Sequence, residues 1–135
     1  HAFRRPQARC DEGRFFGASR NVQAMIDISD GLSTDLDRLC AAGGCGAVVE
    51  SVPVAEAARA VATQKGTDPE RYALGGGEDF ELLVAIAPRA FAHLARRFAQ
   101  RFRRPLQRIG SLRAQSGIDF RGEPLERSGW DHFAP

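Results

Sequence analysis

Short apolar runs and amphipathic stretches alternate along most of this chain. Bounded apolar runs, several of them rich in β-branched residues, predict strands over 22–28, 47–51, 80–86, 106–112 and 118–120. Apolar residues that recur with the period of a helix predict helices over 30–42, after Pro53, after Asp68 and over 88–102. This order of elements predicts an α+β fold: a mixed-sheet α/β sandwich built from two βαβ-like halves.

Two of these elements have apolar faces that predict how they pack. The run 80–86 is apolar on both faces, and because such a strand is covered on both sides, we expect it at the centre of the sheet. The helix after Pro53 has an expected inward face that consists of Val54, Ala57, Ala58 and Val61.

The first part of the chain lacks this periodicity. Residues 1–20 are rich in arginine and glycine, and we expect them to form an irregular arm or a linker. The whole chain has 135 residues, which is the length of a single domain. We therefore assign the α+β domain to residues 21–135.

The composition excludes some classes of protein and favours a reducing compartment. No apolar run approaches the ~20 residues of a membrane-spanning helix. The net charge is only +2, although nearly all basic residues are arginine. Three cysteines cannot form a full disulfide framework, so we expect a cytoplasmic protein. Cys40 and Cys45 flank a glycine helix stop, and we interpret them as small core residues.

The first candidate site is the stretch 27–32, where an apolar strand meets a helix. It gathers Asp27, Ser29 and Asp30 near exposed backbone N–H groups, which attract anions such as phosphates. Helix capping by Ser29 and Asp30 is one explanation. Asp27 gains nothing from capping, and two carboxylates ~6 Å apart repel by roughly 3 kcal/mol at an effective dielectric near 20. A divalent cation such as Mg²⁺ would remove this cost, so both explanations stay open.

The second candidate site is the glycine run that ends in Glu78, Asp79, Phe80 and Glu81. Glycines allow positive φ angles or a close approach of backbone to a ligand, and acidic residues follow at a strand start. A flexible turn with solvated acids is the alternative. The spacing of residues excludes a P-loop and a protein-kinase signature.

Two further features are weaker. Trp130, beside Asp131 and His132, could stack on an aromatic or cationic ligand, or could cover an edge of the core. Residues 88–113 hold eight arginines and no acidic residue. We favour a solvated helix face over a nucleic-acid interface here, because no aromatic residues interleave with the arginines.

Three motifs together resemble a known family. They are Asp27-Ile28-Ser29-Asp30-Gly31-Leu32, Gly76-Gly77-Glu78-Asp79-Phe80-Glu81-Leu82 and Gly129-Trp130-Asp131-His132-Phe133. Their order and spacing resemble the C-terminal domain of thiamine-monophosphate kinase, a domain shared with aminoimidazole ribonucleotide synthetase and partly ferredoxin-like. Related selenophosphate synthetases and hydrogenase-maturation proteins carry different residues at the first motif.

The resemblance implies a reaction and a set of binding residues. The family transfers the γ-phosphoryl group of ATP to thiamine monophosphate and yields thiamine diphosphate, with Mg²⁺ ions around the phosphates. By motif, Asp27 and Asp30 would bind Mg²⁺, Ser29 would contact ATP, and Glu78 and Trp130 would contact the thiamine substrate. Phosphoryl transfer depends mainly on positioning and metal charge, so we assign no general base.

The resemblance covers only one half of such an enzyme. The family's N-terminal domain supplies most metal and nucleotide ligands and the homodimer interface, whereas this chain begins at His1 and matches the domain after the linker. We expect half of a binding site and no activity from this chain alone. The alternative is a ligand-binding or dimerisation module of the same superfamily without catalysis.

Overall fold

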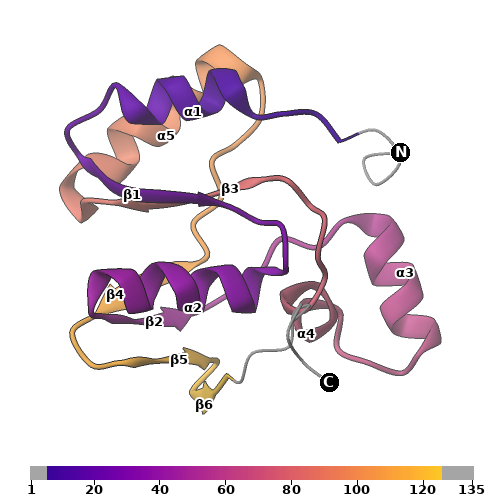
Figure 1. Cartoon of the computed structure of the whole chain (residues 1–135). Helices are drawn as coiled ribbons and strands as arrows, with labels where there is room; N and C mark the ends of the chain where they lie inside the picture. Colours follow the sequence, from indigo (N-terminus) through magenta and orange to yellow (C-terminus); the bar gives the residue numbers. More distant parts are fainter. Residues whose placement is uncertain (1–5, 126–135) are drawn as a thin grey trace.

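The computed structural model describes residues 6–125 as an α+β fold (Figure 1). Its helices are α1 (Cys10–Gly17), α2 (Leu32–Gly43), α3 (Glu56–Gln64), α4 (Pro69–Leu74) and α5 (Pro88–Phe102). Its strands are β1 (Val22–Asp27), β2 (Gly46–Val49), β3 (Leu82–Ile86), β4 (Gly110–Arg113), β5 (Gly117–Phe120) and β6 (Glu123–Pro124). No helix in the described part of the chain combines the length and apolar character needed to cross a membrane.

The strands form two separate sheets. Strands β1 and β3 pair antiparallel as a two-stranded sheet, with Asp27 opposite Leu82 at its end. The other sheet has the order β4-β2-β5-β6, in which β2 and β5 are parallel and the remaining pairs are antiparallel. The predicted α+β fold with a mixed sheet is therefore confirmed.

Helix α2 lies between the two sheets and carries much of the core (Figure 1). Leu32, Leu36 and Cys40 recur on its inner face and are at most 6% exposed. They belong to one apolar cluster with Val49 of β2 and Phe120 of β5. Burying each such leucine contributes about 1.5–3 kcal/mol, so this stripe fixes where α2 begins and which way its first turn faces.

The expectation that residues 1–20 form an irregular arm is wrong for Cys10–Gly17, which form helix α1. Phe15 contacts the rings of Phe98 and Phe102 on α5, and Phe16 contacts the ring of Phe98, with centroid distances between 5.4 and 5.9 Å. The sequence gives no sign of the helix, because its apolar residues are adjacent and show no period. Tertiary packing against α5 stabilises it. That the preceding residues connect to a further domain stays a prediction.

The prediction that 80–86 is a central strand is wrong. Strand β3 pairs only with β1 among the described residues. Its two faces are apolar because helices α1 and α5 lie on one side of the pair and α2 lies on the other (Figure 1). Cover by helices on both sides thus produces the sequence pattern of a central strand.

Several predicted boundaries and one predicted face also differ. The helix after Pro53 begins at Glu56. Ala62 is its fully buried residue, whereas Val61, which we expected inside, is 38% exposed. Strand β4 begins at Gly110, later than the predicted start at 106, because β2 offers it only four partners.

Candidate functional site

The loop between β1 and α2 is organised by a residue that the sequence did not single out. Helix α2 begins at Leu32, with Gly31 as its N-cap at φ 122°. The carboxylate Oδ2 of Asp35 accepts hydrogen bonds from the backbone N–H groups of Ser29, Asp30 and Gly31, at 3.0, 3.0 and 3.2 Å. The interpretation of Ser29 as N-cap and Asp30 as a first-turn acid is therefore wrong. The loop is folded around a carboxylate from within the helix.

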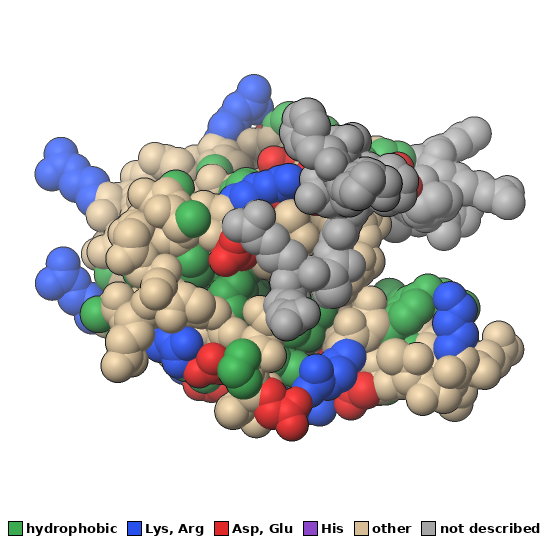
Figure 2. All heavy atoms as spheres, turned by 60° about the horizontal axis from the view of Figure 1, so that its bottom comes forward, with side chains coloured by type: hydrophobic (Ala, Val, Ile, Leu, Met, Phe, Trp, Pro, Cys, Tyr) green, Lys and Arg blue, Asp and Glu red, His purple; other side chains and the backbone are tan. Residues whose placement is uncertain are grey.

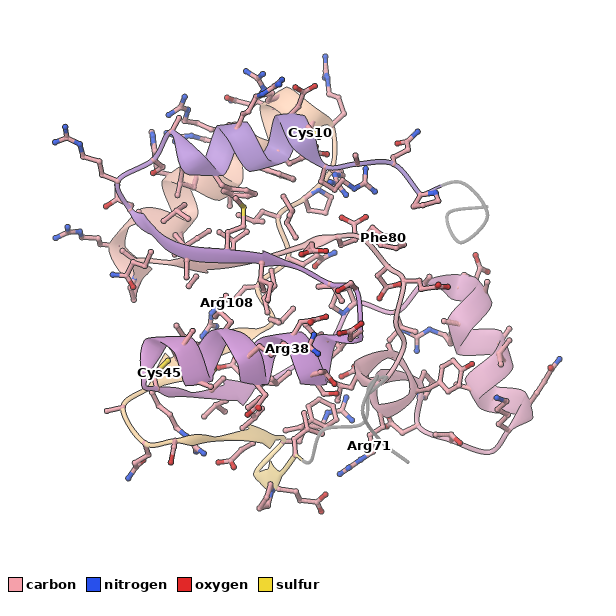
Figure 3. All side chains as sticks on the ribbon, in the orientation of Figure 1. Cys10, Arg38, Cys45, Arg71, Phe80 and Arg108 are labelled. Atoms are coloured by element: carbon pink, nitrogen blue, oxygen red, sulfur yellow. The ribbon has the colours of Figure 1, made fainter. Side chains whose placement is uncertain are left out.

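Asp35 also fixes an arginine at the mouth of this loop. Its side chain is 1% exposed, and its Oδ1 accepts a hydrogen bond from Nη1 of Arg38 at 2.8 Å. The same guanidinium pairs with the carboxylate of Asp30. Hydrogen bonding to Asp30, and then to Asp35, raises the pKa of Arg38 against the opposing effect of desolvation. Figure 3 shows Arg38 on α2 near the loop.

Asp27 differs from its neighbours in the loop. It ends β1, its side chain is exposed, and no ion pair joins it to the described part of the chain. A strand-terminal carboxylate held toward solvent by a two-stranded sheet is free to accept a cation. The loop therefore presents one open carboxylate, Asp27, and one that Arg38 already partly neutralises, Asp30.

The glycine segment runs alongside this loop and is joined to it by the backbone. The N–H of Glu78 donates to the carbonyl of Ser29 at 2.7 Å, and the N–H of Phe80 donates to the carbonyl of Ile28 at 2.8 Å. In return, the N–H of Ile28 donates to the carbonyl of Glu81 at 2.9 Å. The first two sequence motifs thus form one structural unit at the edge of the β1–β3 sheet.

Gly77 is required by the closeness of the two segments. A Cβ atom built at this position would lie 2.9 Å from the carbonyl oxygen of Ser29, which is closer than real Cβ contacts. The glycine therefore serves approach of backbone to backbone. This is the role that glycines near a site commonly have, although here the neighbour is the chain itself.

The segment after Gly77 holds an unusual backbone. Glu78 and Phe80 adopt positive φ angles of 63° and 50°, each at a cost of about 1–2 kcal/mol for a residue with a side chain. Strain of this kind is commonly found at ligand sites. It leaves Phe80 37% exposed at the entrance to β3, where Figure 3 marks it. Asp79 lies between these two residues. Desolvation, and then the nearby charge of Glu81, raise the pKa of Asp79.

Ion pairs from two other parts of the chain hold the glycine segment in place. Glu81 accepts from Arg9, just before α1, at 2.5 Å and from Arg104, after α5, at 3.2 Å. Arg104 also pairs with Glu12 of α1 at 2.8 Å. Helix α1 therefore supports the site through charge as well as through its phenylalanines.

Helix α4, which leads into the glycine segment, is anchored at its other end. Arg121 pairs with Asp68 and Glu70 at 3.3 and 2.8 Å, and Arg71 pairs with Glu123. Figure 2 shows such basic and acidic side chains side by side along one edge of the molecule. These links connect the start of α4 to the β5–β6 hairpin.

The arginine-rich stretch 88–113 does not form one uniform basic surface. Arg104, Arg108 and Arg113 pair with carboxylates from other elements, at 3.1 Å for Arg108 with Glu50. The arginines on α5 are exposed, as expected for a solvated helix face. That this stretch is a solvated face rather than a nucleic-acid interface stays a prediction.

The candidate residues fit a partial metal site. Within residues 6–125, no group of three or more His, Cys, Asp or Glu side chains is placed to hold an ion by itself. Asp27 at the end of β1 and Asp30 in the following loop lie three residues apart in sequence, which suits a cation that takes further ligands from phosphates and water. Trp130, the last predicted site residue, lies outside the described residues.

Asp35 and Arg38 are the residues that sequence reasoning missed. One signal was present in the sequence: Ser33, Thr34 and Asp35 form a polar run directly after Leu32, at the start of a helix with an apolar inner face. All three are buried. Three adjacent polar residues between Leu32 and Leu36 also fit the exposed face of an amphipathic helix, so this run is only a weak signal of buried polar partners.

The chain belongs to the family described as AIR synthase related protein, C-terminal domain, which matches residues 4–122. Within it, the chain is similar to thiamine-monophosphate kinases. It is 36% identical to that of Rhodopirellula baltica, over 84% of this chain and 36% of the relative. It is 31% identical to that of Aquifex aeolicus, over 96% of this chain and 39% of the relative. The chain thus spans about two fifths of the relatives' length.

Solved structures agree with this assignment. The thiamine-monophosphate kinase of Stenotrophomonas maltophilia K279a matches with a TM-score of 0.77 and 32% identity, over 90% of this chain and 37% of that one. A structure named "AaThiL complexed with AMPPCP and TMP" matches with a TM-score of 0.74 and 28% identity, over 96% and 39%. The hydrogenase maturation protein HypE of E. coli, 21% identical with a TM-score of 0.65, shares the fold.

Proposed function

We propose that this chain is the C-terminal part of an ATP-dependent kinase that phosphorylates thiamine monophosphate to thiamine diphosphate. The observation that carries the proposal is the backbone pairing of the 28–31 loop with the 78–81 segment. It brings Asp27, Ser29, Asp30 and Glu78 to one edge of the sheet. Similarity to a protein solved with AMPPCP and TMP supports both substrates.

In this function the two ends of the site have different roles. Asp27 and Asp30 hold Mg²⁺, and Ser29 contacts ATP. The bound Mg²⁺ supplies positive charge against the phosphates. Arg38 places a permanent positive charge beside Asp30, which limits repulsion between the carboxylates when Mg²⁺ is absent. Glu78 and Trp130 contact the substrate, because an acid and an indole suit a flat, cationic thiazolium ring.

The chain supplies half of the site. Two carboxylates from one loop are fewer ligands than clustered Mg²⁺ ions require. The remaining ligands come from an N-terminal domain, which also forms a homodimer in the complete cytoplasmic enzyme. We therefore expect the isolated chain to be inactive. A ligand-binding or dimerisation module without catalysis is the alternative.

Kinetics of the complete enzyme test this proposal. In an enzyme that joins this chain to its N-terminal domain, Asp27→Asn is expected to lower kcat and to raise the Mg²⁺ concentration needed for half-maximal rate. Asp11→Asn, on the exposed face of α1, is the matched control and leaves both values unchanged. Unchanged Mg²⁺ dependence in the Asp27 variant would contradict the metal role. Absence of any thiamine-monophosphate phosphorylation by the complete protein would favour the non-catalytic module.

A further inference from the structure

The opposite end of α2, away from the candidate site, brings two cysteines together. The helix ends at Gly43, and Gly44 adopts the left-handed conformation with φ 62°. The N–H of Gly44 donates to the carbonyl of Ala41 at 3.2 Å, and the N–H of Cys45 donates to the carbonyl of Cys40 at 3.0 Å. This is the Schellman pattern, which folds the residue after the left-handed glycine back onto the last turn of the helix.

In this pattern, the side chains of Cys40 and Cys45 take the place of the usual apolar contact. The Sγ atom of Cys45 lies 3.4 Å from the position that a Cβ atom of Gly43 would take, on the turn of the helix that follows Cys40. Both are free cysteines, and Cys45 packs against the core cluster that contains Cys40. The backbone hydrogen bond from Cys45 to Cys40 thus holds the two residues next to each other before any bond forms, which a disulfide requires.

The two cysteines differ in access to solvent. Cys40 is 2% exposed, whereas Cys45 is half-buried. Cys45 lines a groove of about 460 Å³, together with Gly43 and Leu112. Figure 3 marks Cys45 at the end of α2. The groove gives a small molecule a path to Cys45 but leaves Cys40 behind it.

We propose that Cys40 and Cys45 form a dithiol site that low-molecular-weight disulfides, such as glutathione disulfide, oxidise to an intramolecular disulfide. This site is separate from the candidate kinase site and does not depend on the proposed function. The third cysteine, Cys10, lies on α1 and is exposed, so it has no part in the site.

The reaction proceeds in two exchange steps. The Cys45 thiolate attacks one sulfur of glutathione disulfide and releases one glutathione thiolate, which leaves a mixed disulfide on Cys45. Burial and the neighbouring Cys45 raise the pKa of Cys40 to about 11, so the released thiolate or solvent takes its proton in the second step. The Cys40 sulfur then attacks the Cys45 sulfur and expels the second glutathione. Two protein thiols are oxidised, and one disulfide is reduced to two thiols.

Mass spectrometry tests the proposal directly. The Cys10→Ser chain is equilibrated with reduced and oxidised glutathione at stepped ratios, blocked with N-ethylmaleimide and digested with trypsin. Both cysteines lie in the single peptide 39–59. We expect this peptide to lose two hydrogens and to take up no maleimide as the mixture becomes oxidising. Persistence of two blocked thiols, or a stable glutathione adduct on Cys45, would overturn the proposal.

Two comparisons separate a built site from mere proximity in sequence. In Cys40→Ser, the reaction is expected to stop at the glutathione adduct on Cys45. In 8 M urea, where the helix end is lost, the wild-type pair is expected to need a more oxidising mixture for half-conversion. A half-conversion point that does not change in urea would show that the fold contributes nothing.

Discussion

The backbone N–H of Glu78 donates to the carbonyl oxygen of Ser29 across 2.7 Å and joins two motifs that are far apart in the sequence. The two residues belong to separate candidate sites, and neither motif shows the other's position. Their contact joins two separate sequence signals into one surface with acidic side chains on both sides. We derive specific predictions from this contact for the residues around it.

Gly77→Ala is expected to destabilise the chain by about 1–3 kcal/mol, because its Cβ would push against the carbonyl of Ser29. Gly76→Ala is the matched control, since the nearest atom to its Cβ would lie at 3.6 Å. Urea denaturation measures both variants. Equal stability of the two variants would contradict the close approach.

Asp35→Ala is expected to cost about 3 kcal/mol, because three backbone N–H groups and Arg38 lose a buried, charged acceptor. The free energy of unfolding and the hydrogen exchange of the Asp30 amide report this loss. Asp11→Ala, whose side chain is 71% exposed, is expected to change stability by no more than about 0.5 kcal/mol. A loss below about 1 kcal/mol in the Asp35 variant would show that the loop is held by other contacts.

Glu78→Gly is expected to raise stability by about 1 kcal/mol, because glycine adopts φ 63° without strain. In the complete enzyme, the same variant is expected to raise KM for thiamine monophosphate. Arg103→Gly, at φ 57° after α5, should show the gain in stability without the change in KM. If the Glu78 variant kept its KM, the carboxylate would have no role in substrate binding.

The raised pKa of Asp79 is expected to make the folded chain less stable as the pH rises. Desolvation, with Glu81 second, raises its pKa in the folded chain above the unfolded value, so the folded state binds the proton more tightly. Its contribution to stability is therefore present below about pH 4 and is lost as the pH rises through the folded pKa. Asp79→Asn removes this loss. The free energy of unfolding of the variant, minus that of the wild type, is therefore expected to be more favourable to the variant at pH 7 than at pH 3. Denaturation midpoints at both pH values check the sign.

The periodic pattern predicted α5 with its observed bounds and placed β1, α2 and α4 to within a few residues. Each of these has either a long apolar stripe or clear start and stop residues, such as Asp68 and Pro69 at α4. The elements that it missed or misplaced depend on distant partners. Helix α1 exists because Phe15 and Phe16 meet α5, and β3 looks central because helices cover it on both sides.

The site shows the same division. Sequence motifs predicted Asp27, Ser29, Asp30 and Glu78 as site residues, and the structure brings the two segments that carry them together at one end of the β1–β3 sheet. The sequence could not show that Asp35 holds the loop or that Arg38 partly neutralises Asp30, because a helical residue's inward partners depend on a loop whose path is set by tertiary contacts. Glycine at position 77 was noted, yet its neighbour is the Ser29 carbonyl rather than a ligand.

The most direct test follows where a divalent ion binds on this chain. Manganese(II) with ATP is titrated into the isotopically labelled protein, and paramagnetic broadening of each backbone amide signal is measured by NMR. We expect selective broadening at residues 27–31 and 77–81 together, and its loss in Asp27→Asn. Broadening confined to other acidic residues, or unchanged in that variant, would contradict a shared metal and nucleotide site.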